Sequence, residues 1–329
     1  MAGSGEKVNY SVRTSKSIER KMMCEIIGCL EHITSVKDYR YIGMGAKFFT
    51  DFVLMHKKFG ISEMLSLETK RSPEEVRRFN FNKPYNCIQI EFKNTTEWLN
   101  STNYKWKDKN DIIWFDYDGS LRLNQITDIA LAVKKVKSCS IIFASTNIDF
   151  LKNMKEEKPK ERLETYCSLI NEEAFTKHLT VKDFAGEAGI MKTIADTFNI
   201  AIEDAVVESN KVKTNQNNKI YVDQIAYFTY SDSFTQMITL GWIIYTEFHK
   251  DAIHKCGIDK LPFYRGKGLE PYNITVPVLT YKEISVLNKN MPEYQYPIEE
   301  APFLTKDEVD EYSKIYRYYP TTIETGLVL

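Results

Sequence analysis

The sequence lacks an excess of charge of either sign. Its 44 lysine and arginine residues nearly balance 45 aspartate and glutamate residues, for a formal net charge of −1. Proteins that bind a nucleic-acid backbone draw much of their affinity from basic residues that neutralise phosphates. The composition therefore gives no strong nucleic-acid signal, although it is compatible with a local basic patch.

The sequence also lacks cysteine and histidine residues at the short spacings that are typical of zinc sites and redox motifs. His249 and His254, five residues apart, would not share a helix face. We therefore predict no metal site built on these side chains. Scattered free thiols are typical of a reducing compartment; the cysteines are Cys24, Cys29, Cys87, Cys139, Cys167 and Cys256.

No uninterrupted apolar run is long enough to cross a bilayer. The opening residues, Met-Ala-Gly-Ser-Gly-Glu-Lys, lack the apolar core of a signal peptide. We therefore expect no membrane association and a cytoplasmic location.

Strand-like and helix-like stretches alternate through the first half of the chain. Strands are expected at 39–45, 61–68, 87–92, 111–115 and 140–145, and helices at 15–31, 48–58, 72–79 and 124–136. This alternation predicts an α/β protein with a doubly wound, mostly parallel sheet. Further strands at 221–230 and 235–245 predict a terminal antiparallel hairpin, which brings the sheet to seven strands.

A chain of 329 residues that is 43% hydrophobic can bury a sizeable core. We predict an N-terminal cap helix segment (1–36), a Rossmann-like nucleotide-binding domain (37–246) and a C-terminal appendage packed on the sheet (247–329). In the appendage, Thr280 and Glu283 predict a capping box at the start of a short helix. Four aromatic residues near its end predict internal packing or a homo-oligomer contact: Tyr312, Tyr316, Tyr318 and Tyr319.

A strand, two glycines and a helix follow one another around Gly43 and Gly45. Glycines at such a place let the backbone approach a ligand, and the next helix offers free N–H groups. Glu68 ends the following strand, where a carboxylate can accept both hydroxyls of a ribose. The combination predicts a nucleotide-type ligand. The alternative is a tight strand–helix turn with a solvated Glu68.

Asp116-Tyr117-Asp118-Gly119 directly follows the fourth expected strand. The carboxylates of Asp116 and Asp118 could act as a general base toward a hydroxyl, or bind Mg²⁺ that acidifies it. Tyr117 could cover a bound ligand. The alternative is that Asp116 caps the next helix and Asp118 sets a turn.

These features resemble the class I, Rossmann-like S-adenosylmethionine-dependent methyltransferases over roughly residues 37–245. The resemblance implies that the Gly43-Met44-Gly45 loop passes under the methionine part of the cofactor and that Glu68 holds the ribose. It also implies that Phe92 and its neighbours meet the adenine, and that Asp116 faces the methyl group. The runs Ser-Ile-Glu-Arg-Lys-Met-Met from Ser17 and Tyr-Ile-Gly-Met-Gly-Ala-Lys-Phe-Phe from Tyr41 are similar to bacterial proteins labelled putative O-methyltransferases.

The chain departs from the family pattern at two cofactor positions. Tyr41 stands where the family has an acid that anchors the amino group of the cofactor, and Lys47 replaces the third glycine. Lys47 could instead attract a phosphate or carboxylate. An NAD site fits less well, because its third glycine would fall at Phe48. The loop after the fourth strand lacks the prolines of nucleic-acid amino-methyltransferases, which disfavours adenine or cytosine N-methylation.

In many methyltransferases a segment before the first strand folds over the cofactor. Arg13, Lys16 and Arg20 lie on such a segment and could bind an anionic substrate, with arginine offering bidentate contacts. The alternative is an ordinary exposed helix face. Asp51, one turn into the helix after the glycines, could favour the dipole end of the helix or touch the cofactor, but it is expected on the helix surface.

The leading hypothesis is a methyltransferase that moves a methyl group from S-adenosylmethionine to an oxygen or nitrogen of an unknown acceptor. The alternative is a non-catalytic module on the same fold that binds a nucleotide or a partner, for example in a bacterial defence or signalling system. Tyr41 and Lys47 favour this alternative, because both depart from the cofactor motif.

Overall fold

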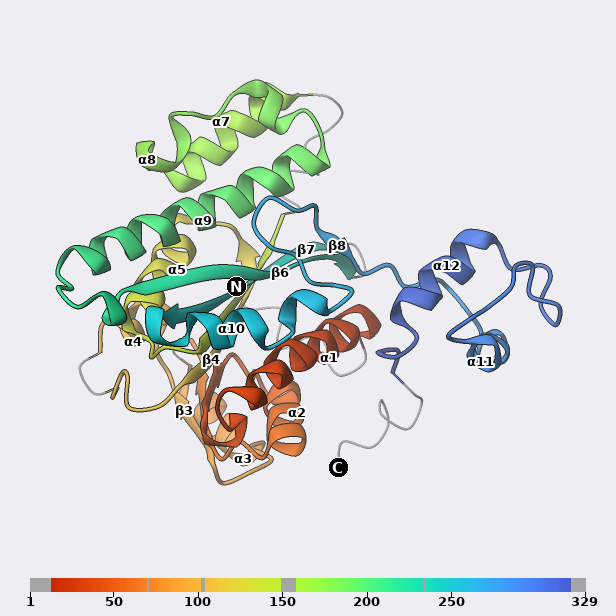
Figure 1. The fold of residues 1–329 in the computed structure, drawn as a ribbon, viewed down its shortest axis with the longest axis horizontal. Coiled ribbons are helices and arrows are strands. Elements are labelled where there is room, and N and C mark those ends of the chain that lie inside the picture. Colours follow the sequence, from red (N-terminus) through yellow and green to blue (C-terminus); the bar gives the residue numbers. More distant parts are fainter. Residues whose placement is uncertain (1–12, 70, 102–103, 149–157, 233–234, 321–329) are drawn as a thin grey trace.

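The computed structural model describes residues 13–69, 71–101, 104–148, 158–232 and 235–320. A mixed sheet with strand order β3-β2-β1-β4-β5-β7-β6-β8 forms its centre (Figure 1). The strands are β1 (Arg40–Gly43), β2 (Glu63–Leu67), β3 (Ile88–Glu91), β4 (Asp111–Ser120), β5 (Ser140–Asn147), β6 (Ile220–Asp232), β7 (Thr235–Thr246) and β8 (Tyr272–Asn273).

The first five strands are parallel, and β7 runs antiparallel to both β5 and β6. This arrangement confirms the doubly wound sheet and its antiparallel hairpin. The two-residue strand β8 pairs parallel to β6 at Phe228 and Thr229 and adds an eighth strand to the predicted seven.

Helices cover both faces of the sheet, because consecutive strand residues point to opposite faces and both are apolar. Tyr41 belongs to one hydrophobic cluster, and its neighbour Ile42 belongs to the other. The first cluster packs under α1 (Thr14–Gly28), α2 (Thr50–Phe59) and α10 (Lys250–Lys255). The second packs under α4 (Thr95–Leu99), α5 (Leu123–Lys135) and α9 (Glu187–Lys211). Outside α9 lie α7 (Pro159–Ile170) and α8 (Glu173–Thr176) (Figure 1).

Strand β4 is longer than expected and irregular at its end. Asp116 pairs with Ser145 of β5 and Ser120 pairs with Asn147, so three residues on β4 oppose one on β5. Such bulges re-aim side chains at the ends of strands. The stretch predicted as a loop after the fourth strand is therefore a bulge within it.

The C-terminal helices α11 (Tyr281–Asn290) and α12 (Lys306–Ile315) project beside the main body (Figure 1). They share a small core of their own, which includes Leu287, Val309 and Tyr312. The predicted capping box of Thr280 and Glu283 is confirmed at the start of α11. The division of the chain into three parts remains a prediction.

Two of the four C-terminal tyrosines pack inside the protein. Tyr312 lies in the core of α11 and α12, whereas Tyr318 packs on Phe263 and donates a 2.7 Å hydrogen bond to Glu25 of α1. Tyr316 and Tyr319 line a groove between α11 and α12. The oligomer contact expected of these tyrosines remains a prediction.

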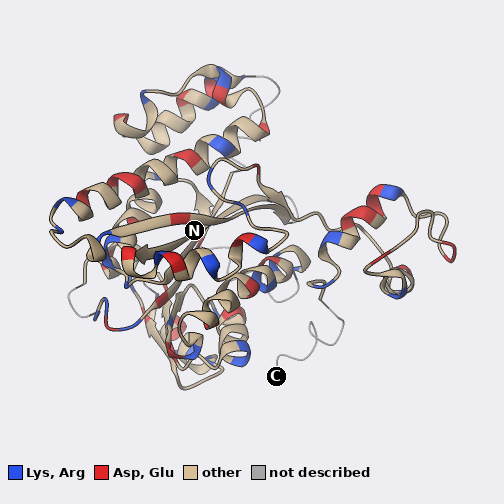
Figure 2. Ribbon diagram, in the orientation of Figure 1, with Lys and Arg blue, Asp and Glu red and all other residues tan. Residues whose placement is uncertain are grey.

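Basic and acidic residues are interspersed along the drawn helices (Figure 2). Within the described ranges, no helix combines the length and the apolar character that a membrane crossing requires. Helix α3 (Pro73–Phe81), which follows β2, begins with a capping box formed by Ser72 and Glu75.

Candidate functional site

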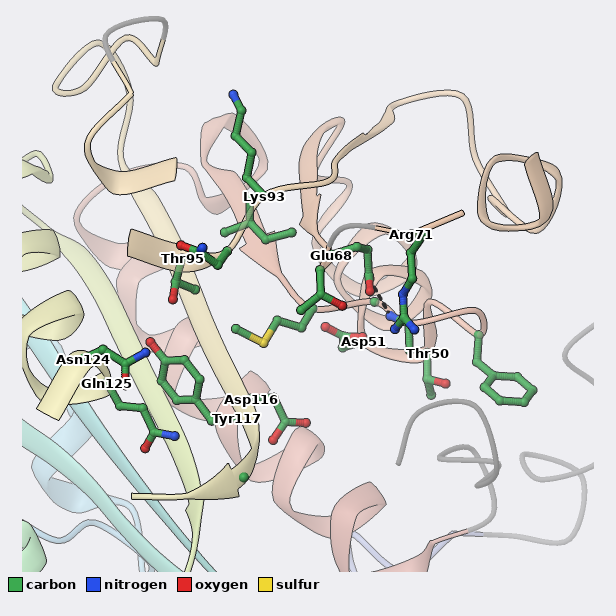
Figure 3. A pocket seen from close by; sticks show the side chains of 18 of the residues that line it. Thr50, Asp51, Glu68, Arg71, Lys93, Thr95, Asp116, Tyr117, Asn124 and Gln125 are labelled. Carbon is green, nitrogen blue, oxygen red and sulfur yellow. Dashed lines mark hydrogen bonds between the residues drawn. The ribbon is translucent and has the colours of Figure 1, made fainter. Parts of the chain in front are cut away.

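A cavity of about 530 Å³ opens at the carboxyl ends of β1, β2 and β4 (Figure 3). Strand β1 lies between β2 and β4, so the chain leaves the centre of the sheet in opposite directions. Ligands of open α/β sheets bind at such a switch point, and the volume is in the range of small-molecule sites. Its polar lining includes Arg20, Asp51, Glu68, Arg71, Lys93, Thr95, Asp116, Asn124 and Gln125.

The loop after β1 is shaped by its own packing. A Cβ on Gly45 would lie 2.6 Å from the Phe49 ring, and one on Gly43 would lie 2.9 Å from Tyr41 Oη. The left-handed conformations fall instead on Ala46 and Phe49, with φ of 47° and 50°. The glycines are therefore required by close contacts inside the protein, while Gly45 also lines the cavity.

Glu68 fastens this loop to the end of β2. Its Oε1 accepts hydrogen bonds from the Ala46 N–H at 2.8 Å and from Ser66 Oγ at 2.9 Å, and Ser66 Oγ accepts the Gly45 N–H. Glu68 is only 7% exposed, so the alternative of a solvated side chain is wrong. Burial raises the pKa of Glu68 to about 7, although the bonds from Ser66 and Ala46 act in the opposite direction.

Tyr41 and Asp51 form a buried pair behind the loop. Tyr41 Oη donates to Asp51 Oδ2, and the Asp51 carboxylate reaches the cavity wall at the start of α2. Asp51 is 6% exposed, so the expected position on the helix surface is wrong. Burial raises the pKa of Asp51, against the opposing effects of Arg20 and of the Tyr41 hydrogen bond.

Lys16 on α1 is buried beside the end of β4. Its Nζ lies 2.8 Å from Asp116 Oδ1, 2.9 Å from Tyr230 Oη and 3.0 Å from Glu19 Oε2. It also lies 4.5 Å from the centre of the Trp114 ring. Burial alone would lower the pKa of Lys16, but the neighbouring acidic groups raise it well above the usual value.

Tyr117 covers the side of the cavity nearest α5. Its ring lies 5.9 Å from that of Phe115, and its hydroxyl reaches Asp128 at 3.5 Å. Asp128 also accepts hydrogen bonds from Thr95 and Thr96, at 2.5 and 2.7 Å. This network joins the bulge of β4 to the N-terminus of α4.

The structure gathers part of the predicted site in the cavity. Residues predicted from the sequence that line it are Met44, Gly45, Glu68, Asp116, Tyr117 and Arg20. Predicted residues that are not among its lining are Tyr41, Gly43, Lys47, Phe92, Arg13 and Lys16. The side chain of Asp118 lies outside the described part of the structure. The roles of all these residues remain predictions.

Two of the residues away from the cavity are held by neighbours. Phe92 packs edge-on against Phe79 of α3 at 6.1 Å, so the next residue, Lys93, takes the place at the cavity. Lys16 is only 1% exposed and is held by the acids around it. The alternative of an ordinary exposed helix face is therefore wrong for Lys16, and its role toward an anionic substrate remains a prediction.

Sequence reasoning missed several residues of the cavity wall, among them Arg71, Thr95, Asn124 and Gln125. Asn94, N-cap of α4, could have been found, because Asn94 and Glu97 form a capping box at this N-terminus. Asn124 and Gln125 lie in the first turn of α5 and carry no comparable local signal.

Among the described residues, no three or more His, Cys, Asp or Glu side chains are grouped so as to hold a metal ion. The expectation of Mg²⁺ at Asp116 has no support here, because Lys16 pairs with that carboxylate.

Solved structures similar to this chain include a probable spermidine synthase from Corynebacterium glutamicum, with 9% sequence identity and a TM-score of 0.40. The similarity covers 80% of this chain and 82% of that chain. A geranyl diphosphate methyltransferase in complex with SAM has 10% identity, 67% and 84% coverage, and a TM-score of 0.32. The fibrillarin pre-rRNA processing protein of Methanococcus jannaschii has 11% identity, 64% and 70% coverage, and a TM-score of 0.32. Likenesses of this strength carry no argument about function.

A search among curated protein sequences found no match. The family model described as "Putative O-methyltransferase" matches residues 8–326, which is nearly the whole chain. The doubly wound sheet with its antiparallel hairpin agrees with the fold that the resemblance implied. The chain therefore belongs to the putative O-methyltransferase family.

Proposed function

We propose that this protein is an S-adenosylmethionine-dependent O-methyltransferase whose cofactor binds in the cavity at the end of β1. The observation that carries the proposal is that Gly45, Glu68 and Asp116 line one cavity at the switch point of the sheet. Family membership supports the same reading, since the family's label names transfer to oxygen.

The residues present fit such a cofactor. Glu68 is a buried carboxylate at the cavity wall, and its Oε1 accepts the hydrogen bonds from Ala46 and Ser66. Glu68 would hold the ribose, the loop from Met44 to Ala46 would face the amino-acid end, and Lys93 to Thr95 would border the base. When bound, S-adenosylmethionine would supply a methyl group attached to a sulfonium sulfur, and the resulting thioether is a good leaving group.

The protein's own task in such a transfer is mainly alignment, because the leaving group is already activated. Asp116 stands on the bulge of β4, held from behind by Lys16, with its side chain 20% exposed. In the proposed reaction it would accept a proton from an acceptor hydroxyl at the cavity. Met44, Leu67 and Tyr117 add apolar surface that excludes water from this space.

The contact between Lys16 and Asp116 also supports the second candidate, a non-catalytic module that binds a nucleotide. Lys16 Nζ already contacts Asp116 Oδ1, so this oxygen is not available to an acceptor hydroxyl. The cavity would then retain its ligand without transferring a methyl group.

The test measures binding and turnover on the same full-length protein. Calorimetry with S-adenosylhomocysteine is expected to show micromolar binding that Glu68→Ala abolishes and Glu203→Gln leaves intact, because Glu203 is an exposed residue of α9 outside this cavity. No binding of S-adenosylmethionine or S-adenosylhomocysteine would remove the proposal. Binding without release of S-adenosylhomocysteine during incubation with S-adenosylmethionine and cell extract would select the non-catalytic module.

A further inference from the structure

We infer that Asp51 and Arg20 form a cradle for the two charges of an α-amino acid group, Asp51 for the ammonium and Arg20 for the carboxylate. The inference rests on the proposed function, and it assigns the amino-acid end of the cofactor to two side chains outside the glycine loop. Both line the cavity although they come from different helices, α2 and α1.

Asp51 restores a carboxylate that the loop sequence lacks. Tyr41 occupies the place of the family's acid, and its hydroxyl donates to Asp51 Oδ2. A Cβ on Gly43 would lie 3.1 Å from Asp51 Oδ2, so the acid stands directly against the loop. Tyr41 thus acts as a positioning residue that holds an acid supplied ten residues later along the chain.

The burial of the Asp51 carboxylate favours the binding of a cation next to it. Asp51 is nine-tenths buried and lines a cavity, and desolvation raises its pKa. A buried carboxylate is stabilised in its charged form by an opposite charge within a few ångströms. Arg20 already acts on Asp51 in this sense, and an ammonium group of a ligand in the cavity would add a direct charge-assisted hydrogen bond.

Arg20 supplies the complementary charge. It is 5% exposed on α1, its guanidinium lies 5.8 Å from the centre of the Trp114 ring, and it lowers the pKa of Asp51. The planar guanidinium suits a carboxylate, which it can bind through two hydrogen bonds. A zwitterion would thus meet an acid and a base on the same wall.

The order of the strands decides which end of the ligand lies here. Glu68 ends β2, α2 with Asp51 follows β1, and Asp116 lies on β4 on the other side of β1. In Figure 3, Asp51 lies between Glu68 and Asp116. A molecule whose ribose is held by Glu68 therefore passes Asp51 with its amino-acid end.

The test compares three ligands on the full-length protein by calorimetry. The first is S-adenosylhomocysteine. The second is its analogue with a 3-carboxypropyl chain, which lacks the amine, and the third is its analogue with a 3-aminopropyl chain, which lacks the carboxylate. Hydrogen bonds to charged groups predict that the unmodified protein prefers the first ligand to each analogue by about tenfold or more.

Each variant serves as the control for the other. Asp51→Asn is expected to abolish the preference over the carboxypropyl analogue and to keep the preference over the aminopropyl one. Arg20→Met is expected to do the reverse, since methionine has a long unbranched side chain without the charge. Glu68→Gln, which removes a charge at the ribose, is expected to weaken the binding of all three ligands by a similar factor.

The outcomes separate this inference from the proposed function. If the unmodified protein binds none of the ligands, the proposed function falls and the cradle with it. If it binds all three equally, or if Asp51→Asn keeps the preference for the amine, the cradle alone is overturned. The comparison in the unmodified protein decides the matter even where a variant does not fold.

Discussion

The Tyr41 hydroxyl donates a hydrogen bond to the Asp51 carboxylate across the loop that joins β1 to α2. The residue that breaks the family's cofactor motif therefore holds an acid at the same place. Three features meet here: a phenol, a carboxylate and the absent side chain of Gly43, next to which both groups pack.

We predict that Gly43→Ala destabilises the protein by about 1–3 kcal/mol, because overpacking of a closed contact costs this much. The new Cβ would lie 2.9 Å from Tyr41 Oη and 3.1 Å from Asp51 Oδ2. Urea unfolding followed by circular dichroism measures the change. Gly119→Ala is the control, since no atom lies within 4 Å of its added Cβ. Equal effects of the two substitutions would refute the steric explanation.

Lys16→Met is expected to lower the free energy of unfolding by about 3–5 kcal/mol, because it leaves the buried Glu19 and the partly buried Asp116 without their cation. Asp116 and Glu19 both contact Lys16 Nζ. Thermal or urea unfolding gives the value. Lys192→Met is matched to it, because Lys192 pairs with Asp196 on the exposed face of α9, where loss of an ion pair costs only about 0–1 kcal/mol. A similar small loss for Lys16→Met would contradict the prediction.

The effect of Glu68→Gln on stability should depend on pH. The pKa of Glu68 is raised from 4.5 to about 7 in the folded protein, so the folded state binds this proton more tightly than the unfolded chain does. Its contribution to stability is therefore present below pH 4.5 and is lost as pH rises to about 7.

Without ligand, Glu68→Gln should thus match the unmodified protein near pH 5 and be more stable at pH 8 by about 2–3 kcal/mol. The amide oxygen can still accept from Ala46 and Ser66. Urea titrations at the two pH values test this. A variant that is less stable than the unmodified protein at pH 8 would show that Glu68 is not strained by burial.

Ligand binding at pH 7 should release protons. Ribose hydroxyls that donate to Glu68 favour its charged form. Because its pKa is about 7, roughly half a proton per site should leave from Glu68. The binding enthalpy of S-adenosylhomocysteine would then vary with the ionisation enthalpy of the buffer. Glu68→Gln should reduce this slope, and any remainder would come from Asp51, whose pKa burial also raises. A slope of zero in the unmodified protein would contradict the prediction.

Local patterns in the sequence determined the secondary structure and the sheet. The apolar run of β4 and the capping box of Thr280 and Glu283 each involve only a few neighbouring residues. Such local features can be predicted from the sequence without knowledge of the fold. The position of Glu68 at the cavity follows from the same logic, because the carboxyl ends of parallel strands share one edge.

Only the tertiary structure decided which charges are buried and which partners they have. Lys16 meets Asp116 across 100 residues and Tyr230 across 214. From the sequence, Asp51 is expected on the surface of α2, but in the structure it is buried and bonded to Tyr41. Phe92 packs against Phe79 and does not line the cavity. Periodicity reports which residues are apolar along one element, but burial of a charge depends on what a distant segment brings to it.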